Sequence, residues 1–224
     1  MESRRSIVLW LSLALIGLTA TVLAGVLAVQ QIRSRNADSK YKPSIALHYD
    51  VDYVLDDDGG LEVVENIEYE LRSRGGVIVR NYGGGMPADM VPVDFAVTRD
   101  GKPESMSWER VPGGGHRLVV GDVSLGLIGV HRYRLSYRIP DALSHDRAEF
   151  VYPLISTGYA VQVEHARLTL KLPVSTTLVQ CVVGVSKPCD VTGEGSTNLV
   201  IEAGPMPPNS GVTLRALLAQ PLSG

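Results

Sequence analysis

The chain has 224 residues, of which 21 are Lys or Arg and 24 are Asp or Glu, giving a formal net charge of −3 at pH 7. Residues 1–43 carry six basic and two acidic residues, a net of +4, so the remainder carries 15 basic and 22 acidic residues, a net of −7. The negative net charge of residues 44–224 excludes nucleic acid as their partner. These roughly 180 residues are the size of one domain.

The first element in chain order is an apolar run from Ser6 to Ile32 that contains no charged residue. As a helix, residues 7–29 span roughly 34 Å, enough to cross a hydrocarbon core of about 30 Å. The run exceeds the apolar core of a secretory signal peptide, which favours an uncleaved anchor. Secretion after cleavage near Ala24 or Ala28 is the alternative. We predict three N-terminal segments: a short tail (1–5), a transmembrane helix or signal anchor (6–32) and a polar tether (33–43).

Basic residues flank both ends of this run, so its direction in the membrane is not fixed by charge alone. Arg4 and Arg5 precede it, and four basic residues follow: Arg33, Arg35, Lys40 and Lys42. The count favours a cytoplasmic C-terminal side, but large domains cross membranes largely regardless of charge. With the cysteines and the family resemblance below, we expect a single-pass protein of the cell membrane whose C-terminal domain is extracytoplasmic. The lipid bilayer is the partner of residues 6–32.

From Ser44 onward, apolar residues alternate with polar ones at a period of two. Residues 45–55 and 61–71 alternate on either side of an acidic, glycine-rich turn, which is typical of a long β-hairpin. Glycine-rich residues 81–85 and 112–115 are expected to be loops. Further alternating runs cover 91–97, 106–111, 118–120, 131–139, 149–155, 161–172, 178–185, 199–203 and 212–218. About ten to twelve strands predict an all-β fold, an antiparallel β-sandwich with immunoglobulin-like layers over 44–219, followed by a tail over 220–224.

Two details of the alternation make finer predictions. Val163 and Leu168 lie on opposite phases of one run, which predicts a bulge near residues 164–166. The hairpin's second strand and the strand over 131–139 each carry like charges on one face. If these strands pair, cross-strand ion pairs should join two sets of residues, Glu62, Glu68 and Glu70 with Arg132, Arg134 and Arg138.

Four acidic residues form a possible interaction or ion site: Asp56, Asp57, Asp58 and Glu65. The three aspartates fit a solvated hairpin turn, with calcium binding as the alternative. Glu65 lies on the apolar face of its strand, between Val63 and Ile67. A carboxylate there must be paired or lie near a sheet edge, so it is the acidic residue with the best case for a specific role. No His-Glu-x-x-His or Cys-x-x-Cys motif occurs, and we predict neither a metal site nor a cofactor.

Cys181 and Cys189 are the only cysteines of the chain. Outside the cytoplasm a disulfide is the natural interpretation, with two unrelated thiols as the alternative. The short loop that it closes would stabilise the fold by roughly 2 to 3 kcal/mol.

The order of these features resembles a family of predicted bacterial membrane proteins, domain of unknown function 2207. The matching stretches are Tyr49-Asp50-Val51, Gly60-Leu61-Glu62-Val63-Val64-Glu65, Tyr133-Arg134-Leu135-Ser136-Tyr137-Arg138, Gly158-Tyr159, Leu170-Lys171-Leu172-Pro173, the loop from Cys181 to Cys189, and Met206-Pro207-Pro208-Asn209-Ser210-Gly211-Val212-Thr213. The resemblance implies an export segment followed by an extracytoplasmic β domain, and it implies no reaction. The chain departs from the family in lacking tryptophans near Tyr152 and Tyr159 and a second membrane helix after Leu218.

No catalytic motif is present, including the Gly-x-Ser-x-Gly elbow of serine hydrolases. We therefore expect a non-enzymatic binding or assembly module of the cell envelope, whose partner is an envelope protein or polymer. One alternative is an envelope hydrolase in which Glu65 and an aspartate of the 56–58 turn divide acid and base roles. The other is a calcium-dependent adhesion module.

Overall fold

The computed structural model describes residues 43–72, 76–82, 91–111, 115–143 and 145–222. The predicted tail, membrane segment and tether up to residue 42 lie outside this range. Within it, no helix has both the length and the apolar character needed to cross a bilayer. The chain divides into two units, Met1–Lys42 and Pro43–Gly224, and the second unit is described below.

The described residues form three β-sheets and a single short 3-10 helix, η2 (Val123–Leu125). The eight-stranded sheet has the order β13 (Asp190–Thr192), β14 (Asn198–Ala203), β10 (Gln162–Lys171), β1 (Ile45–Leu55), β2 (Leu61–Leu71), β8 (Gly129–Ile139), β4 (Val93–Arg99) and β5 (Lys102–Pro103). A four-stranded sheet has the order β12 (Lys187–Pro188), β11 (Thr176–Val183), β15 (Val212–Leu218) and β9 (Glu149–Ile155). The third sheet contains β3 (Ile78–Tyr82), β7 (Gly115–Val120) and β6 (Met106–Val111).

The predicted hairpin is confirmed with its expected bounds. Strands β1 and β2 pair in antiparallel fashion, with Val51 opposite Glu65. Tyr49, Val51 and Tyr53 are buried, whereas Asp50 between them is exposed. This period-two burial arises because successive side chains of a strand point to opposite faces of the sheet. The hairpin therefore presents one apolar face to the core and one polar face to solvent.

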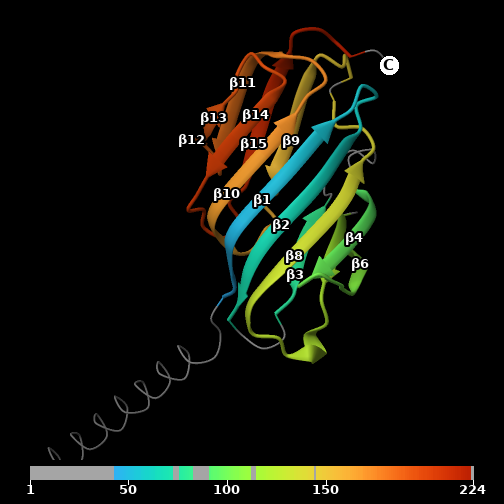
Figure 1. Ribbon diagram of the computed structural model, residues 1–224, viewed down its shortest axis with the longest axis vertical. Coiled ribbons are helices and arrows are strands. Elements are labelled where there is room, and N and C mark those ends of the chain that lie inside the picture. The colour runs from blue at the N-terminus through green and yellow to red at the C-terminus, as the bar shows by residue number, and fades with distance from the viewer. Residues whose placement is uncertain (1–42, 73–75, 83–90, 112–114, 144, 223–224) are drawn as a thin grey trace, which may run out of the picture. The chain divides into compact units, whose positions relative to one another are not determined.

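The core lies between the eight-stranded sheet and the two smaller sheets, which cover its buried face (Figure 1). Contacts across the layers come from both small sheets. The hydroxyl of Tyr53 on β1 donates a hydrogen bond to the carbonyl of Leu154 on β9, and Glu65 on β2 contacts Arg80 on β3. The layered all-β class is therefore confirmed.

The expectation of a wholly antiparallel, immunoglobulin-like sandwich is wrong in one respect. Strand β1 pairs with β10 in parallel, with Tyr49 opposite Ala166. A parallel pair requires a long crossover connection, and here more than 100 residues separate the two strands. Local alternation predicts which residues share a face, but it carries no signal for the direction of so distant a partner.

The phase change expected in β10 occurs, but the register shift lies in the neighbouring strand. Val163 and Ala166 are both buried, so the alternation of β10 resets between them. Strands β10 and β1 stay in register along their whole pairing. The shift lies between β1 and β2, at Ala46 and His48. The irregularity thus belongs to β1, and β10 follows it because the two strands are paired.

The sequence pattern missed β3 and also the strands of two or three residues, β5, β12 and β13. Residues Asn81 and Tyr82, expected in a loop, end strand β3. Only five residues long, β3 pairs with β7, which begins at Gly115 and is longer than expected. Short strands beside glycine-rich segments alternate over too few residues to be recognised.

Candidate functional site

Asp56 is held by the hairpin turn and by a neighbouring strand. Its Oδ1 accepts a hydrogen bond from the backbone N–H of Gly60 at 2.7 Å, and its Oδ2 accepts one from Nη2 of Arg138 at 2.7 Å. Partial burial opposes the charge of Asp56, but the hydrogen bonds from Arg138 and Gly60 outweigh it and lower the pKa of this carboxyl. The same guanidinium also binds Glu62 at 2.9 Å.

Asp57 and Asp58, the other two aspartates of the turn, are exposed to solvent. The backbone carbonyl of Asp57 accepts a hydrogen bond from Nη2 of Arg147 at 3.1 Å. Across the described part of the chain, no group of three or more His, Cys, Asp or Glu side chains is arranged to hold a metal ion. The turn is fixed by arginines on both sides, which compete with a cation for its oxygens.

Glu65 is buried, with 2 % of its surface exposed, and all its hydrogen-bond partners come from the core. Its Oε2 accepts hydrogen bonds from the hydroxyl of Tyr49 at 2.8 Å and from Nη2 of Arg80 at 2.6 Å. Its Oε1 accepts one from the hydroxyl of Tyr137 at 2.8 Å. The expectation that this carboxylate is paired is met by a cation and two phenols, none of which is a second carboxylate.

Arg80 is the partner that the sequence pattern did not identify. Its guanidinium carbon lies 4.0 Å from the ring centroid of Tyr159 and 5.2 Å from that of Tyr49, in cation–π geometry. Burial opposes the charge of Arg80, but attraction to Glu65 and the surrounding phenols outweighs it, and the pKa of Arg80 is raised. A signal existed, because Arg80 alternates in phase with Ile78 and Tyr82, and Glu65 was expected to be paired or to lie near a sheet edge.

The buried pair lacks the features of an open reaction site. The pKa of Tyr49 and of Tyr137 is raised, first by burial, so both phenols stay protonated and serve as hydrogen-bond donors. A cavity of about 20 Å³ adjoins Glu65 and Arg80, which is room for about one water molecule. Asp56 lies nine positions before Glu65 along the hairpin. The four residue steps of β2 from Leu61 to Glu65 alone span roughly 13 Å. The four predicted site residues are therefore not one cluster.

An open surface that carries His48 and His165 lies on the outer face of the eight-stranded sheet. His48 on β1 and His165 on β10 are directly opposite each other, and their rings stack with centroids 5.7 Å apart. A groove of about 400 Å³ surrounds this pair and extends past Arg167 to the chain around Cys189. Its lining combines imidazoles with charged side chains of both signs.

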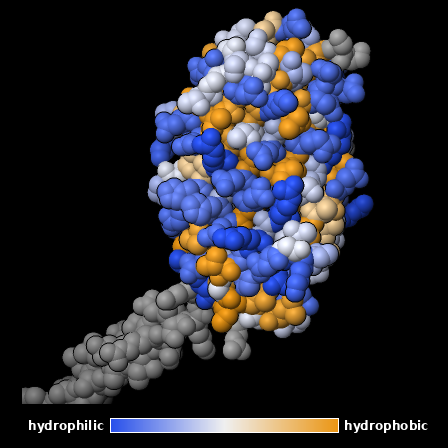
Figure 2. Space-filling view, viewed as in Figure 1, coloured by the Kyte–Doolittle hydropathy of each residue, from blue (hydrophilic) through white to orange (hydrophobic). Residues whose placement is uncertain are grey.

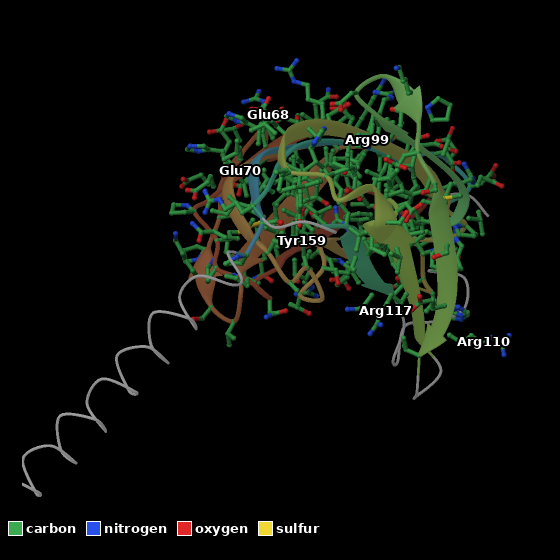
Figure 3. All side chains as sticks on the ribbon, turned by 90° about the horizontal axis from the view of Figure 1, so that it is seen from below. Glu68, Glu70, Arg99, Arg110, Arg117 and Tyr159 are labelled. Carbon is green, nitrogen blue, oxygen red and sulfur yellow. A yellow bond between two sulfur atoms is a disulfide. The ribbon has the colours of Figure 1, made fainter. Side chains whose placement is uncertain are left out.

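A second groove of about 390 Å³ continues across the same face toward β4. It shares His48 and Asp50 with the first groove and reaches Glu68 and Arg132 on the far side. Figure 3 shows Glu68 and Glu70 on this outer side, with Tyr159 between the layers. The two grooves form a polar surface that crosses the strands, and we call it the outer-face groove.

Cross-strand ion pairs line part of this face, as expected from the charges of β2 and β8. Strands β2 and β8 pair, and Arg138 contacts Glu62 at 2.9 Å while Arg132 contacts Glu68 at 3.3 Å. Exposed pairs of this kind contribute little stability. The other members of the two predicted sets pair elsewhere: Glu70 with Arg72, and Arg134 with Asn66.

The predicted disulfide between Cys181 and Cys189 is present. It joins β11 of the four-stranded sheet to the segment that leads from β12 into β13 of the large sheet. The N–H of Cys189 also donates a hydrogen bond to the carbonyl of Cys181 at 3.2 Å. The bond therefore fixes the wall that closes one end of the outer-face groove.

The fold and its sequence motifs correspond to one family model. The model described as predicted membrane protein (DUF2207), N-terminal domain, matches residues 46–218. The chain belongs to this family. The DUF2207 match begins within β1 and ends at the last residue of β15, so it covers the whole β domain. No match was found among curated proteins.

Solved structures similar to this DUF2207 domain include peptidases and hydrolases. Yeast LTA4 hydrolase in complex with bestatin is 11 % identical with a TM-score of 0.43, covering 79 % of this chain and 29 % of that chain. The M1 zinc metallopeptidase from Deinococcus radiodurans is 13 % identical with a TM-score of 0.40, covering 77 % of this chain and 42 % of that chain. The chain thus spans less than half the length of either, and similarities this low carry no inference about activity.

Proposed function

We propose that the protein is a single-pass membrane protein that presents its β domain outside the cytoplasm as a non-enzymatic binding or assembly module of the cell envelope. The contact surface is the outer-face groove. The observation that carries this proposal is the pair of adjoining polar cavities, about 400 and 390 Å³, that share His48 and Asp50. Concave sites of this size with convergent polar groups are typical of ligand surfaces.

The contrast with the buried pair supports placing recognition on the outer face. Glu65 and Arg80 pair with each other inside the core, and the cavity beside them has a volume of only about 20 Å³. In the outer-face groove, His48, His165 and Asp50 remain within reach of solvent. A partner can therefore form hydrogen bonds there without opening the fold.

The location rests on three independent features. The family is one of membrane proteins, the run from Ser6 to Ile32 has the length of a membrane span, and the disulfide is of a kind that persists in oxidising compartments. Together they favour an anchored domain exposed to the envelope.

The chemistry of the groove favours a polar partner that carries both hydrogen-bonding groups and charge. Arg167 and Arg132 supply donors, while Asp50 and Glu68 supply acceptors. Mixed charge of this kind gives orientation and specificity more than bulk attraction. A polar envelope polymer or the charged surface of an envelope protein fits this description.

A site-specific photocrosslinker tests the contact surface in the native membrane. It is placed at His165 in the outer-face groove and, as a control, at Thr177, which is exposed on β11 of the smaller sheet. We expect a discrete crosslinked product from position 165 and none from position 177. Equal products from both positions, or none from either, would contradict the proposed surface.

Orientation is tested separately with Lys102→Cys, at an exposed position that begins β5 after the tight turn from β4. The native cysteines are joined to each other and do not compete for the reagent. A membrane-impermeant maleimide should label the variant in intact cells. Labelling that requires permeabilised cells would overturn the extracytoplasmic placement.

A further inference from the structure

Exposed apolar side chains concentrate in the connection between β7 and β8 and at the start of β8. Val123, Leu125, Ile128 and Val130 are 63 %, 54 %, 56 % and 52 % exposed. Among the described residues, these four belong to a set of eleven large exposed hydrophobic side chains, so more than a third of that set falls within eight positions. Clustered apolar exposure of this kind marks an interaction site.

The connection is an ordered structure that holds these side chains outward. Asp122 caps the short helix η2 by accepting a hydrogen bond from the N–H of Ser124 at 2.7 Å. Gly126 ends the helix with φ of 58°, a left-handed conformation that glycine adopts without strain. Leu127 packs against the core and holds the connection in place at its base. We call residues 121–130 the apolar loop.

The apolar loop lies at the end of the large sheet where the chain enters the domain. Strand β8 starts at Gly129, opposite Leu71 on β2, and β1 starts at Ile45, opposite Glu70. Two strand spacings separate β1 from β8, roughly 10 Å. In Figure 1 the loop is the yellow-green turn at the lower end, where Figure 2 also shows hydrophobic surface.

The length of the preceding chain limits how far this end can be from a membrane. Twelve residues, 33–44, separate Ile32 from Ile45. Even fully extended, they span at most about 43 Å. A domain anchored through residues 6–32 therefore keeps this end within about 43 Å of the bilayer surface.

We propose that the apolar loop inserts into the interfacial region of the lipid bilayer. This inference rests on the membrane anchoring stated under the proposed function and adds a second contact to it. Asp122 is the only charged residue of the loop, so binding comes from burial of Val123, Leu125 and Ile128 rather than from attraction to anionic headgroups. The contact fixes the tilt of the domain and holds the outer-face groove at a defined height above the membrane.

The test uses the full chain reconstituted in phosphatidylcholine nanodiscs, with an environment-sensitive fluorophore on Leu125→Cys. Asp57→Cys, in the turn at the opposite end of β1 and β2, is the matched control. We expect the emission at position 125 to shift to the blue and to be quenched by lipids brominated on their acyl chains. The control position should show neither effect.

A second set of variants measures how much the apolar side chains contribute to insertion of the loop. With the fluorophore on Val123→Cys, the added substitutions Leu125→Ser and Ile128→Ser should reduce the inserted population at least tenfold, because each removed side chain weakens burial by about that factor. Equivalent serine substitution of Val54, exposed but distant from the loop, should change nothing. Equal melting temperatures of the variants establish that the fold is intact.

The other possible outcomes distinguish a failure of the anchoring from a failure of the loop insertion. A chain released from membranes by alkaline carbonate would overturn the anchoring itself. A chain that stays anchored but shows no quenching at position 125 would overturn the loop insertion alone. A blue shift that depends on the ratio of protein to lipid, without bromine quenching, would assign the apolar loop to contact between two copies of the chain and would likewise overturn insertion.

Discussion

Arg80 and Glu65 form an ion pair in the centre of the core, with Nη2 2.6 Å from Oε2 and side chains only 4 % and 3 % exposed. Arg80 belongs to a three-stranded sheet and Glu65 to the eight-stranded sheet, so the pair joins two layers. Burial of both charges is costly, and the attraction between them offsets that cost only while both are present. The pair therefore makes the pairing of the two layers specific.

Removing one partner of this pair should destabilise the fold severely. Glu65→Gln leaves the Arg80 guanidinium without a counter-charge, and Arg80→Met leaves the carboxylate with two phenols only. We expect each to lower the free energy of unfolding by about 3 to 5 kcal/mol. Denaturant unfolding of the solubilised protein, followed by circular dichroism, measures this.

The double variant supplies the control for that prediction. Glu65→Gln combined with Arg80→Met removes both charges, so its cost should be smaller than the sum of the single costs by more than 1 kcal/mol. Additivity of the two single effects would show that the charges do not depend on each other.

Acid should weaken the fold through carboxylates whose pKa is lowered in the folded state. The N–H of Arg132 and the imidazole of His131 bind Asp100 and lower its pKa, and Arg138 does the same for Asp56. The unfolded state then binds protons more readily, so the stabilisation is complete above the ordinary value of 3.8 and is lost as pH falls below it. Unfolding measured from pH 6 to pH 2.5 should show this loss, and Asp100→Asn should flatten it. The exposed-site control is Asp57→Asn. If the free energy of unfolding falls with pH equally steeply in wild type, Asp100→Asn and Asp57→Asn, Asp100 does not contribute to the loss of stability in acid.

The disulfide should stabilise the domain through the short loop that it closes. Replacing both Cys181 and Cys189 with Ser removes the cross-link, and we expect a loss of about 2 to 3 kcal/mol from the greater freedom of the unfolded chain. Hydrogen exchange should also rise in β12 and β13, which flank Cys189. The comparison is the wild-type chain unfolded with and without a reductant. Equal unfolding midpoints in both conditions would show that the disulfide does not stabilise the fold.

Two glycines of the turn between β13 and β14 should respond differently to alanine. Both have positive φ, 89° at Gly193 and 76° at Gly195, but a Cβ on Gly193 would lie 2.0 Å from the carbonyl oxygen of Asn198, whereas Gly195 faces open space. Gly195→Ala should cost only the left-handed conformation, about 1 kcal/mol. Gly193→Ala should cost clearly more because the backbone must move. Equal shifts in melting temperature would contradict this difference.

Much of the fold follows from the sequence because the relevant signal is local. The alternation of β1 and β2 and the charged turn between them predict the hairpin to the residue, since face and turn are determined by neighbouring side chains. The position of Glu65 among apolar residues likewise required a partner or a place near the sheet edge. The partner, Arg80, is one of the arginines that alternate in phase with apolar neighbours. Its strand, β3, is too short for the sequence pattern to single it out.

The sequence alone determined which residues alternate between core and solvent, that Glu65 must be paired or lie near a sheet edge, and that two cysteines stand close enough along the chain to bond. Only the tertiary structure decided that Arg80 is the partner of Glu65, that β1 and β10 run parallel, and that His48 and His165 meet to form the outer-face groove. The physical reason is distance along the chain. The face that a side chain occupies and the position of a turn depend on residues a few positions apart. Strand pairing depends instead on which distant segments bury the most apolar surface together.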